Sequence, residues 1–281
     1  MNEQAPNPND LDSYLTDIAD PAPEASNTTK KIPIVETFGP TIQGEGLVIG
    51  YQTFFIRFGG CDYKCERCDS LHAVLPNLIK QNSIYMTMDQ LIYHTRLMHQ
   101  TAKAPYMWTF SGGNPCLWDL TLLVKDIYQR VPTEPIAVET QGTIWQNWLY
   151  DCSFVTVSPK GPGMGEAFNP ETFGIFCKRL HDHPGFSVKV VVFDQRDIEF
   201  VVEILARWPG LRHRMFISIG NTHPPAPAKR DHEEISRDGF IKQVLHSTRQ
   251  IAEEILQDPR LYGVRILPQL HTLLWGNERG R

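Results

Sequence analysis

The sequence predicts an α/β fold, in the form of a partial (β/α) barrel in a single domain. From residue 32 onward, short apolar segments typical of strands alternate with segments typical of helices, and about six to eight strands are expected. Polar motifs repeatedly follow a predicted strand directly. Because the carboxyl ends of parallel strands share one face of a sheet, we expect these motifs to meet in one site.

The composition supports a folded unit and argues against several classes of protein. The chain has 281 residues, of which 41% are hydrophobic and 21% charged, enough to bury one large core or two smaller ones. Six of the 32 acidic residues lie in residues 1–29, so the remainder, with 27 basic and 26 acidic residues, is almost neutral. That balance does not suggest a nucleic-acid partner. Neither an apolar run of about 18 residues nor a basic segment followed by an apolar one occurs. We therefore expect no membrane insertion and a cytoplasmic location.

Residues 1–30 are expected to form a disordered acidic tail. They are rich in Pro, Asn, Asp, Ala and Ser and contain few large apolar side chains, so burial would not offset the entropy lost on ordering. At most, a short helix is expected near residues 11–18. The folded domain is therefore expected to span residues 31–281.

The first part of the domain contains three predicted strands. Residues 32–37 form the first strand and are followed by a glycine-rich loop at 38–46 with polar side chains at its tip. Residues 53–58 form the second strand, which ends at a cysteine-rich loop. A capping box of Thr87 and Gln90 predicts a helix that runs into the low 100s, and residues 105–110 form the third strand.

The second part repeats the order of strand, polar loop and helix. Helices are predicted at about 117–130, 196–208 and 233–257, the last after a Pro-rich loop at 222–232. The predicted strands are 136–139, 154–157, 188–193, 215–219 and 264–267. Two of these strands lead into the polar motifs 139–143 (E-T-Q-G-T) and 158–160 (S-P-K).

The loop after the second strand contains Cys61, Cys65 and Cys68 in the spacing C-x3-C-x2-C. In a chain without a secretion signal, clustered cysteines are more typical of a metal site than of disulfides. One alternative is a zinc knuckle completed by His72 or a distant cysteine, although no second paired arm is evident. The other is a 4Fe-4S cluster with one iron left open to a small molecule. The dispersed cysteines are expected to pack as small apolar groups; they are Cys116, Cys152 and Cys177.

The cysteine spacing, in a loop after an early barrel strand, resembles the signature of the radical S-adenosylmethionine (SAM) enzymes. In that superfamily the open iron binds the amino and carboxylate groups of SAM, whose reductive cleavage starts radical chemistry. Residues 111–115 (S-G-G-N-P) match the position of the superfamily's G-G-E-P element, with Asn114 where Glu is usual. Glycines at such a strand end let backbone groups approach a ligand closely.

A set of six segments is similar to the 7-carboxy-7-deazaguanine synthase family: 36–46 (E-T-F-G-P-T-I-Q-G-E-G), 55–57, 68–70 (C-D-S), 139–143, 158–160 and 267–276. The likeness extends from about residue 32 to the C-terminus, and the S-G-G-N-P and C-D-S variants resemble a subgroup. The resemblance implies a lyase that converts 6-carboxy-5,6,7,8-tetrahydropterin to 7-carboxy-7-deazaguanine with loss of ammonia, in queuosine-type deazapurine biosynthesis. It also implies a 4Fe-4S cluster, SAM and Mg²⁺, an external electron donor of the flavodoxin or ferredoxin type, and a homodimer.

The resemblance assigns roles to the matching positions of this chain. Cys61, Cys65 and Cys68 would ligate the cluster, and Ser70, where the family usually has Thr, would bind Mg²⁺ through its hydroxyl. The residues implied for SAM are Arg67, Cys68, Asp69, Gly113, Ser158, Pro159 and Lys160. The residues implied for the pterin substrate are Ile42, Gln43, Gly44, Glu45, Arg57, Ser111, Gln269 and His271, with Arg57 pairing the substrate carboxylate.

Simpler interpretations stay open at this point. Taken alone, Arg57 and Glu45 are most simply surface charges, and His271 is most simply a core histidine. For the whole chain, one rival is a radical SAM enzyme that activates a protein glycyl site, which would need a large protein partner. The other rival is a non-enzymatic zinc-binding module, which would be colourless and bind zinc with tetrahedral thiolate geometry.

Overall fold

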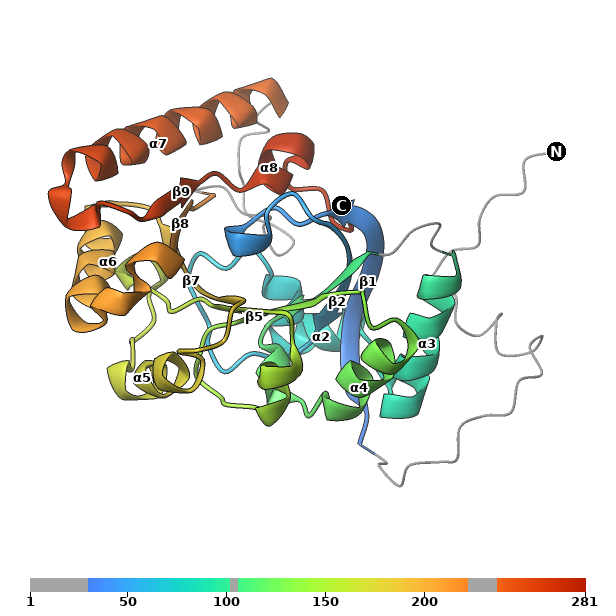
Figure 1. The fold of residues 1–281 in the computed structure, drawn as a ribbon. Helices are drawn as coiled ribbons and strands as arrows, with labels where there is room; N and C mark the ends of the chain where they lie inside the picture. The colour runs from blue at the N-terminus through green and yellow to red at the C-terminus, as the bar shows by residue number, and fades with distance from the viewer. Residues whose placement is uncertain (1–29, 102–105, 222–236) are drawn as a thin grey trace.

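The computed structural model describes residues 30–101, 106–221 and 237–281. The predicted disordered tail, apart from its last residue, and the predicted Pro-rich loop at 222–232 lie outside the described residues. The described ranges form an α/β unit in which helices pack around a strongly curved sheet (Figure 1).

The strands of the described residues are β1 (Ile32–Ile42), β2 (Gln52–Phe58), β3 (Ile84–Met86), β4 (Met107–Gly112), β5 (Ile136–Thr140), β6 (Phe154–Val157), β7 (Phe186–Val192), β8 (Met215–Ile219) and β9 (Arg265–Leu267). They form one sheet in the order β3-β1-β2-β4-β5-β6-β7-β8-β9. The pairs from β2 through β9 are parallel, whereas β1 is antiparallel to both β2 and β3. Because β3 and β9 are unjoined edges, the barrel is partial, as the sequence predicts.

The helices of the described residues are α2 (Pro76–Asn82), α3 (Met88–Thr101), α4 (Thr121–Arg130), α5 (Pro170–Arg179), α6 (Gln195–Arg207), α7 (Arg237–Gln257) and α8 (Leu270–Trp275). In Figure 1, α3 and α4 lie at the β1 end of the sheet, and α5 and α6 lie at the β7 end. The long helix α7 contacts β8 and α8. None of the helices in the described ranges is long and apolar enough to cross a membrane.

The core lies between the parallel strands and the helices outside them. Ile56, Trp108 and Phe110, from neighbouring strands, have no exposed surface, and neither do Leu91 of α3 and Leu123 of α4. Strands that are covered on both faces are typically apolar along their whole length. This explains why these strands can be recognised in the sequence.

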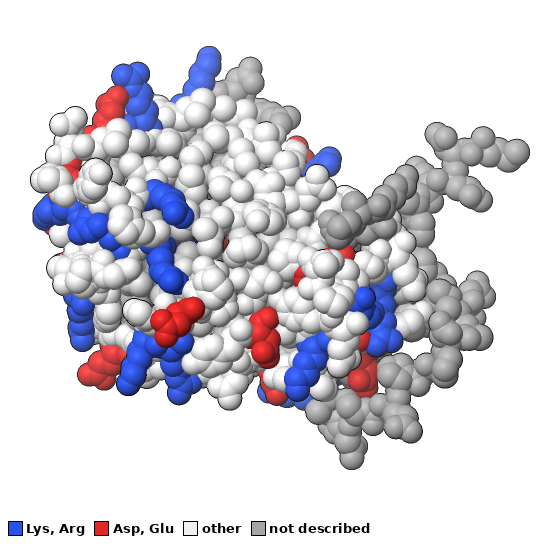
Figure 2. Space-filling view, in the orientation of Figure 1, with Lys and Arg blue, Asp and Glu red and all other residues white. Residues whose placement is uncertain are grey.

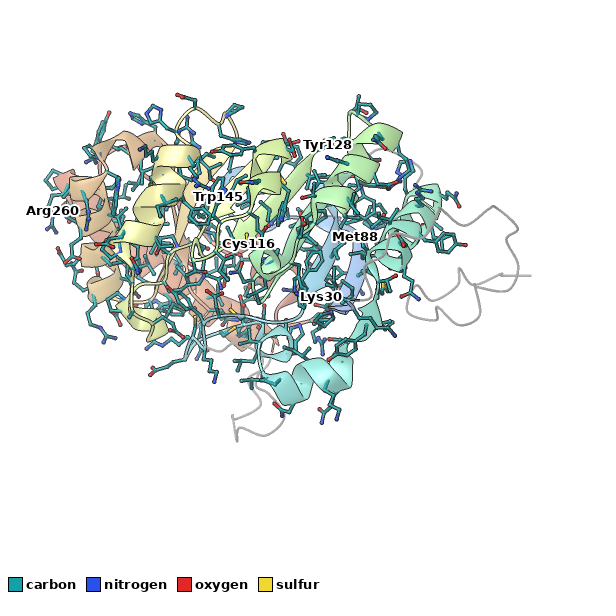
Figure 3. All side chains as sticks on the ribbon, turned by 90° about the horizontal axis from the view of Figure 1, so that it is seen from below. Lys30, Met88, Cys116, Tyr128, Trp145 and Arg260 are labelled. Atoms are coloured by element: carbon teal, nitrogen blue, oxygen red, sulfur yellow. The ribbon has the colours of Figure 1, made fainter. Side chains whose placement is uncertain are left out.

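The cysteines outside the C-x3-C-x2-C loop pack in the interior, as predicted. Cys116, Cys152 and Cys177 are all buried, and Figure 3 shows Cys116 in the interior while Arg260 lies at the periphery. On the face shown in Figure 2, lysine, arginine and acidic side chains are interspersed over a largely uncharged surface.

The first strand is longer than predicted. The expected glycine-rich loop at 38–46 begins only after Ile42, because β1 stays paired with β2 as far as the Ile42–Gln52 pair. A register shift between Phe38 and Thr41 accommodates Gly39 and Pro40. Such an irregularity takes up residues that cannot join the ladder without ending the strand.

Several other boundaries differ from the prediction. The structure confirms the bounds of two predicted strands, 154–157 and 215–219. It also confirms the capping box, in which Thr87 and Gln90 form reciprocal hydrogen bonds of 2.9 and 3.3 Å. The helix expected from about 117 begins at Thr121, because 115–117 forms a separate 3₁₀ turn. Four short elements were not predicted: α2, β3, α5 and α8. For α5 a local signal exists, since Asn169 caps the helix by accepting from Glu171 N and Thr172 N, with proline at the next position.

Candidate active site

A cavity of about 240 Å³ opens at the carboxyl ends of the parallel strands. It brings together most of the predicted site residues although they come from distant segments. Those that line it are Ile42, Gln43, Gly44, Glu45, Arg57, Cys61, Cys65, Arg67, Cys68, Asp69, Ser70, Ser111, Ser158, Lys160, Gln269 and His271. Gly113 and Pro159 are not among its lining residues. Gly113 packs against Gly60 and Cys61, and an added Cβ would lie 2.0 Å from the carbonyl oxygen of Gly60.

The segment 61–70, here called the cluster loop, lies between β2 and the 3₁₀ turn at Leu71–Ala73. Hydrogen-bond donors contact two of its three sulfur atoms: Tyr63 N and Gln141 Nε2 donate to Cys61 Sγ at 3.4 and 3.1 Å. Ser70 N donates to Cys68 Sγ at 3.4 Å. Such N–H···S bonds are among the features that tune iron–sulfur clusters.

The thiols would lose their protons on binding a metal. Burial raises the pKa of Cys61, raises that of Cys65 to about 11 and raises that of Cys68 to about 12. A bound metal would therefore have to displace these protons. In the described residues, no three His, Cys, Asp or Glu side chains converge closely enough to hold a single metal ion. A 4Fe-4S cluster distributes its cysteine ligands over different irons, and the three thiols, with N–H donors to Cys61 and Cys68, fit such a cluster.

A second loop, residues 161–167, holds the cluster loop in place. Its Met164 carbonyl oxygen accepts from Glu66 N at 3.0 Å, and its Glu166 Oε1 accepts from Lys64 N at 2.5 Å. These donors lie between the three cysteines in the chain, so the contacts set the path of the cluster loop.

Asp197, at the start of α6, anchors the 161–167 loop. Its side chain is fully buried and accepts from Gly163 N at 2.7 Å and from Phe193 N at 2.9 Å. The fit is close, since a Cβ on Gly163 would lie 2.2 Å from Asp197 Oδ2. Sequence reasoning missed this residue, because nothing local marks a buried aspartate in an amphipathic helix.

Asn114 is a buried connector and does not line the cavity. Its Oδ1 accepts from Thr140 Oγ1 at 2.9 Å, and its Nδ2 donates to Asp62 Oδ1 at 2.8 Å. Gln141 Nε2 donates to the same Asp62 oxygen at 2.7 Å. The asparagine thereby links the end of β5 to the cluster loop.

Arg57 is fixed at the wall of the cavity by two neighbours. Its Nε donates to Glu36 Oε1 at 2.5 Å and its Nη1 donates to Ser70 Oγ at 3.2 Å. Burial would raise the pKa of Glu36, but the hydrogen bond from His72 and the charge of Arg57 outweigh it and lower the pKa to about 2. His72, a candidate zinc ligand in the sequence, thus pairs with Glu36.

Glu45 lies at the centre of a buried polar cluster. It accepts from Lys189 Nζ at 2.8 Å, from Ser218 Oγ at 2.9 Å and from Gln269 Nε2 at 3.0 Å. Burial opposes its charge, but Lys189 and His271 lower the pKa of Glu45 well below its ordinary value. The interpretation of Glu45 as a surface charge is therefore wrong. Lys189 was missed, although a single lysine in the apolar strand 186–192 is a detectable signal.

The C-terminal segment reaches back to the first strands. Leu270 N donates to the carbonyl oxygen of Gly44 at 3.0 Å, and a Cβ on Gly44 would lie 2.3 Å from His271 Nδ1. Further along, Arg279 pairs with Glu36 at 3.5 Å, and Figure 1 shows the C-terminus beside β1. Arg279 lines the cavity and was not predicted. Ser111 Oγ is buried there and has no hydrogen-bond partner among the described residues.

Known proteins resemble this chain in sequence, and a solved structure resembles it in fold. The 7-carboxy-7-deazaguanine synthase of Bacillus subtilis (strain 168) is 35% identical over 257 residues, which cover 89% of this chain and 99% of that protein. The protein of the same name from Bacillus cereus is 34% identical over 259 residues, with the same coverage. The crystal structure of QueE from Escherichia coli has a TM-score of 0.56 and 24% identity, and covers 86% of this chain and 95% of that chain. No protein-family model matches the sequence.

The partial barrel with a three-cysteine loop at its carboxyl-end cavity defines the radical SAM class of fold. Within that class, the extent of the similarity to the two Bacillus proteins is decisive. The chain belongs to the 7-carboxy-7-deazaguanine synthase family.

Proposed function

We propose that the protein converts 6-carboxy-5,6,7,8-tetrahydropterin to 7-carboxy-7-deazaguanine and ammonia, with a 4Fe-4S cluster, SAM and Mg²⁺ as cofactors. The observation that carries the proposal is that the cluster loop lines the same cavity as Arg57, Glu45 and Gln269. Membership of the synthase family supports the same reaction.

The cluster loop and the end of β6 form the side of the cavity proposed for the cluster and SAM. Cys61, Cys65 and Cys68 would ligate the cluster, and together with SAM it would supply, when bound, a radical able to abstract one substrate hydrogen. Lys160 Nζ donates to Ser158 Oγ at 3.0 Å, and both residues line the cavity. An ammonium next to a hydroxyl suits a carboxylate such as that of SAM.

Ser70 and Asp69 are proposed as the Mg²⁺ site. Ser70 Oγ donates to Asp69 Oδ1 at 2.9 Å, so two oxygen atoms lie together at the edge of the cluster loop. Mg²⁺ prefers oxygen ligands and takes the rest of its shell from water and substrate. The Arg57 contact with Ser70 would then bring the metal and the substrate carboxylate together.

Arg57 is proposed to bind the carboxylate of the pterin. Its bonds to Glu36 and Ser70 fix the plane of the guanidinium, which has more N–H donors than these two bonds use. A fixed fork of donors binds a carboxylate with little further loss of entropy. Holding the heterocycle in one orientation in a closed cavity would direct the radical to a single C–H bond.

A product assay tests the proposed function. Anaerobically reconstituted protein, reduced and supplied with SAM, Mg²⁺ and the tetrahydropterin acid, should release the deazaguanine acid and one ammonia per turnover. Cys65→Ala should lose iron and product together, whereas Cys177→Ala, a matched thiol on α5, should keep both. Zinc in place of iron, or product formation by the Cys65 variant, would contradict the proposal.

The Mg²⁺ site is tested separately. Ser70→Ala should raise the Mg²⁺ concentration for half-maximal activity at least about tenfold, because a ligand oxygen is lost. Ser70→Thr keeps the hydroxyl and should restore the wild-type value. Equal Mg²⁺ dependence in all three proteins would exclude the site. We further propose a flavodoxin- or ferredoxin-type electron donor and a homodimer, which reduction assays and light scattering can test.

A further inference from the structure

A buried ammonium group lies between two carboxylates in the wall of the cavity. Lys189, on β7, donates from Nζ to Glu45 Oε2 at 2.8 Å and to Glu139 Oε1 at 3.4 Å. The Lys189 side chain is 6% exposed, and all three residues line the cavity. The wall therefore presents one hydrogen-bond donor with an acceptor on either side.

The group keeps hydrogen-bonding capacity for a ligand. An ammonium has three N–H donors, and within residues 30–101, 106–221 and 237–281 its acceptors are these two carboxylates. Glu139 Oε1 also accepts from Gln43, whereas its Oε2 accepts no hydrogen bond from the described residues. A buried salt bridge contributes little net stability. The unused donor of Lys189 and the unused acceptor of Glu139 at the cavity are therefore better explained by binding of a ligand than by a role in folding.

The order of acceptor, donor and acceptor matches one edge of a reduced pterin. In a tetrahydropterin the 4-oxo oxygen, an acceptor, lies between the N3–H and N5–H donors. We propose that Lys189 is a specificity-determining residue that donates to the 4-oxo oxygen of the substrate, while Glu45 and Glu139 accept from the N–H groups on either side. This inference rests on the proposed function and goes further by naming the group that selects the 4-oxo ring.

Lys189 would act as a fixed cation and not as an acid. Burial opposes its charge, but Glu139 and Glu45 together raise the pKa of Lys189 above its ordinary value. The ammonium therefore keeps its charge throughout the physiological range. The position of Lys189, between two carboxylates that hold it, suits recognition of a neutral carbonyl oxygen.

The test compares two stable ligands that differ in the substituent at ring position 4 and therefore also at N3, which carries a hydrogen only in the 4-oxo ring. 6-Carboxypterin has a 4-oxo group, and 6-carboxy-2,4-diaminopteridine has a 4-amino group, which would point N–H at the ammonium. Binding is measured by fluorescence titration of the reconstituted holoprotein with SAM and Mg²⁺, without reductant, at neutral pH, where the diamino ring is neutral and the 4-oxo ring keeps its N3–H. Wild type should bind the 4-oxo ligand at least about tenfold more tightly, because a mismatch leaves buried polar groups unpaired.

The variants assign this preference to Lys189. The glutamine side chain can either donate or accept a hydrogen bond. Lys189→Gln should therefore bring the two dissociation constants within about threefold of each other, mainly because the variant binds the 4-oxo ligand more weakly. Lys178→Gln, on the exposed face of α5, is the matched control and should behave as wild type. Iron content and melting temperature check that each variant folds.

The outcomes separate this inference from the proposed function. If wild type binds both ligands equally, or if Lys189→Gln folds and keeps the wild-type preference, the role of Lys189 is refuted while the pterin site stands. If Lys189→Gln does not fold, the wild-type comparison still decides, and Lys189→Arg should retain the 4-oxo preference. If the loaded wild type binds neither 6-carboxypterin nor, without oxygen, the tetrahydropterin acid itself, the proposed function fails, and this inference fails with it.

Discussion

Replacing Asp197 by asparagine should make the cluster labile without unfolding the protein. The carboxylate accepts two backbone N–H groups, from Gly163 and Phe193, and an asparagine of the same shape has only one acceptor oxygen. One buried N–H is then left unpaired and faces the amide, at a cost of about 1–3 kcal/mol. Since 1.4 kcal/mol is about a tenfold change in an equilibrium constant, the equilibrium constant for opening of the 161–167 loop should rise roughly 5- to 140-fold.

The readout is the loss of iron from the cluster loop. The 161–167 loop holds the backbone between the cysteines, so its opening should expose the bound cluster to solvent. With a chelator in excess and without oxygen, the Asp197→Asn holoprotein should release iron about tenfold faster than wild type, as followed by visible absorbance. Asp194→Asn is the matched control, because asparagine also caps helices and Asp194 caps α6. Equal rates of iron release in wild type and Asp197→Asn would refute the anchoring role.

Two further predictions concern acidity and close packing. The pKa of Glu36 is lowered from 4.5 to about 2, so its stabilisation is complete above about pH 4.5 and is lost as the pH falls toward 2. Glu36→Gln should therefore lower the free energy of unfolding at neutral pH by less than about 3 kcal/mol. The difference in free energy between variant and wild type should shrink as the pH falls. A difference that does not change with pH in denaturant titrations would contradict this. Gly44→Ala should weaken 6-carboxypterin binding about tenfold while iron content is unchanged, because the new methyl would overlap His271. Gly210→Ala, with no atom within 4 Å of its Cβ, is the control, and unaltered binding by the Gly44 variant would disprove the argument.

The features predicted correctly from the sequence are those encoded locally. The cysteine spacing, the capping box at Thr87 and the polar residues after buried strands depend on residues close together in the chain. The rule that parallel strands share a carboxyl-end face then explains why segments as distant as Glu45 and Gln269 meet.

The features that were missed depend on contacts between distant segments. The pairing of Arg57 with Glu36 and the reach of Asp197 to Gly163 follow from sheet register and helix placement, which no single window of sequence encodes. Lys189 is intermediate, because a charge within an apolar strand is visible in the sequence but its partners are not. Gly113 packs closely against Gly60, and the contact with SAM that its motif implies stays a prediction.

The bonding of Asn114 has a consequence for how this site can change during evolution. Its amide donates to Asp62, so a glutamate introduced at position 114 would set two carboxylates against each other. Positions 62 and 114 should therefore be epistatic, and exchange between the G-G-N-P and G-G-E-P forms of the strand end should require both to mutate. In a protein with glutamate at position 114 and aspartate still at position 62, repulsion between the two carboxylates should push the cluster loop away from the barrel.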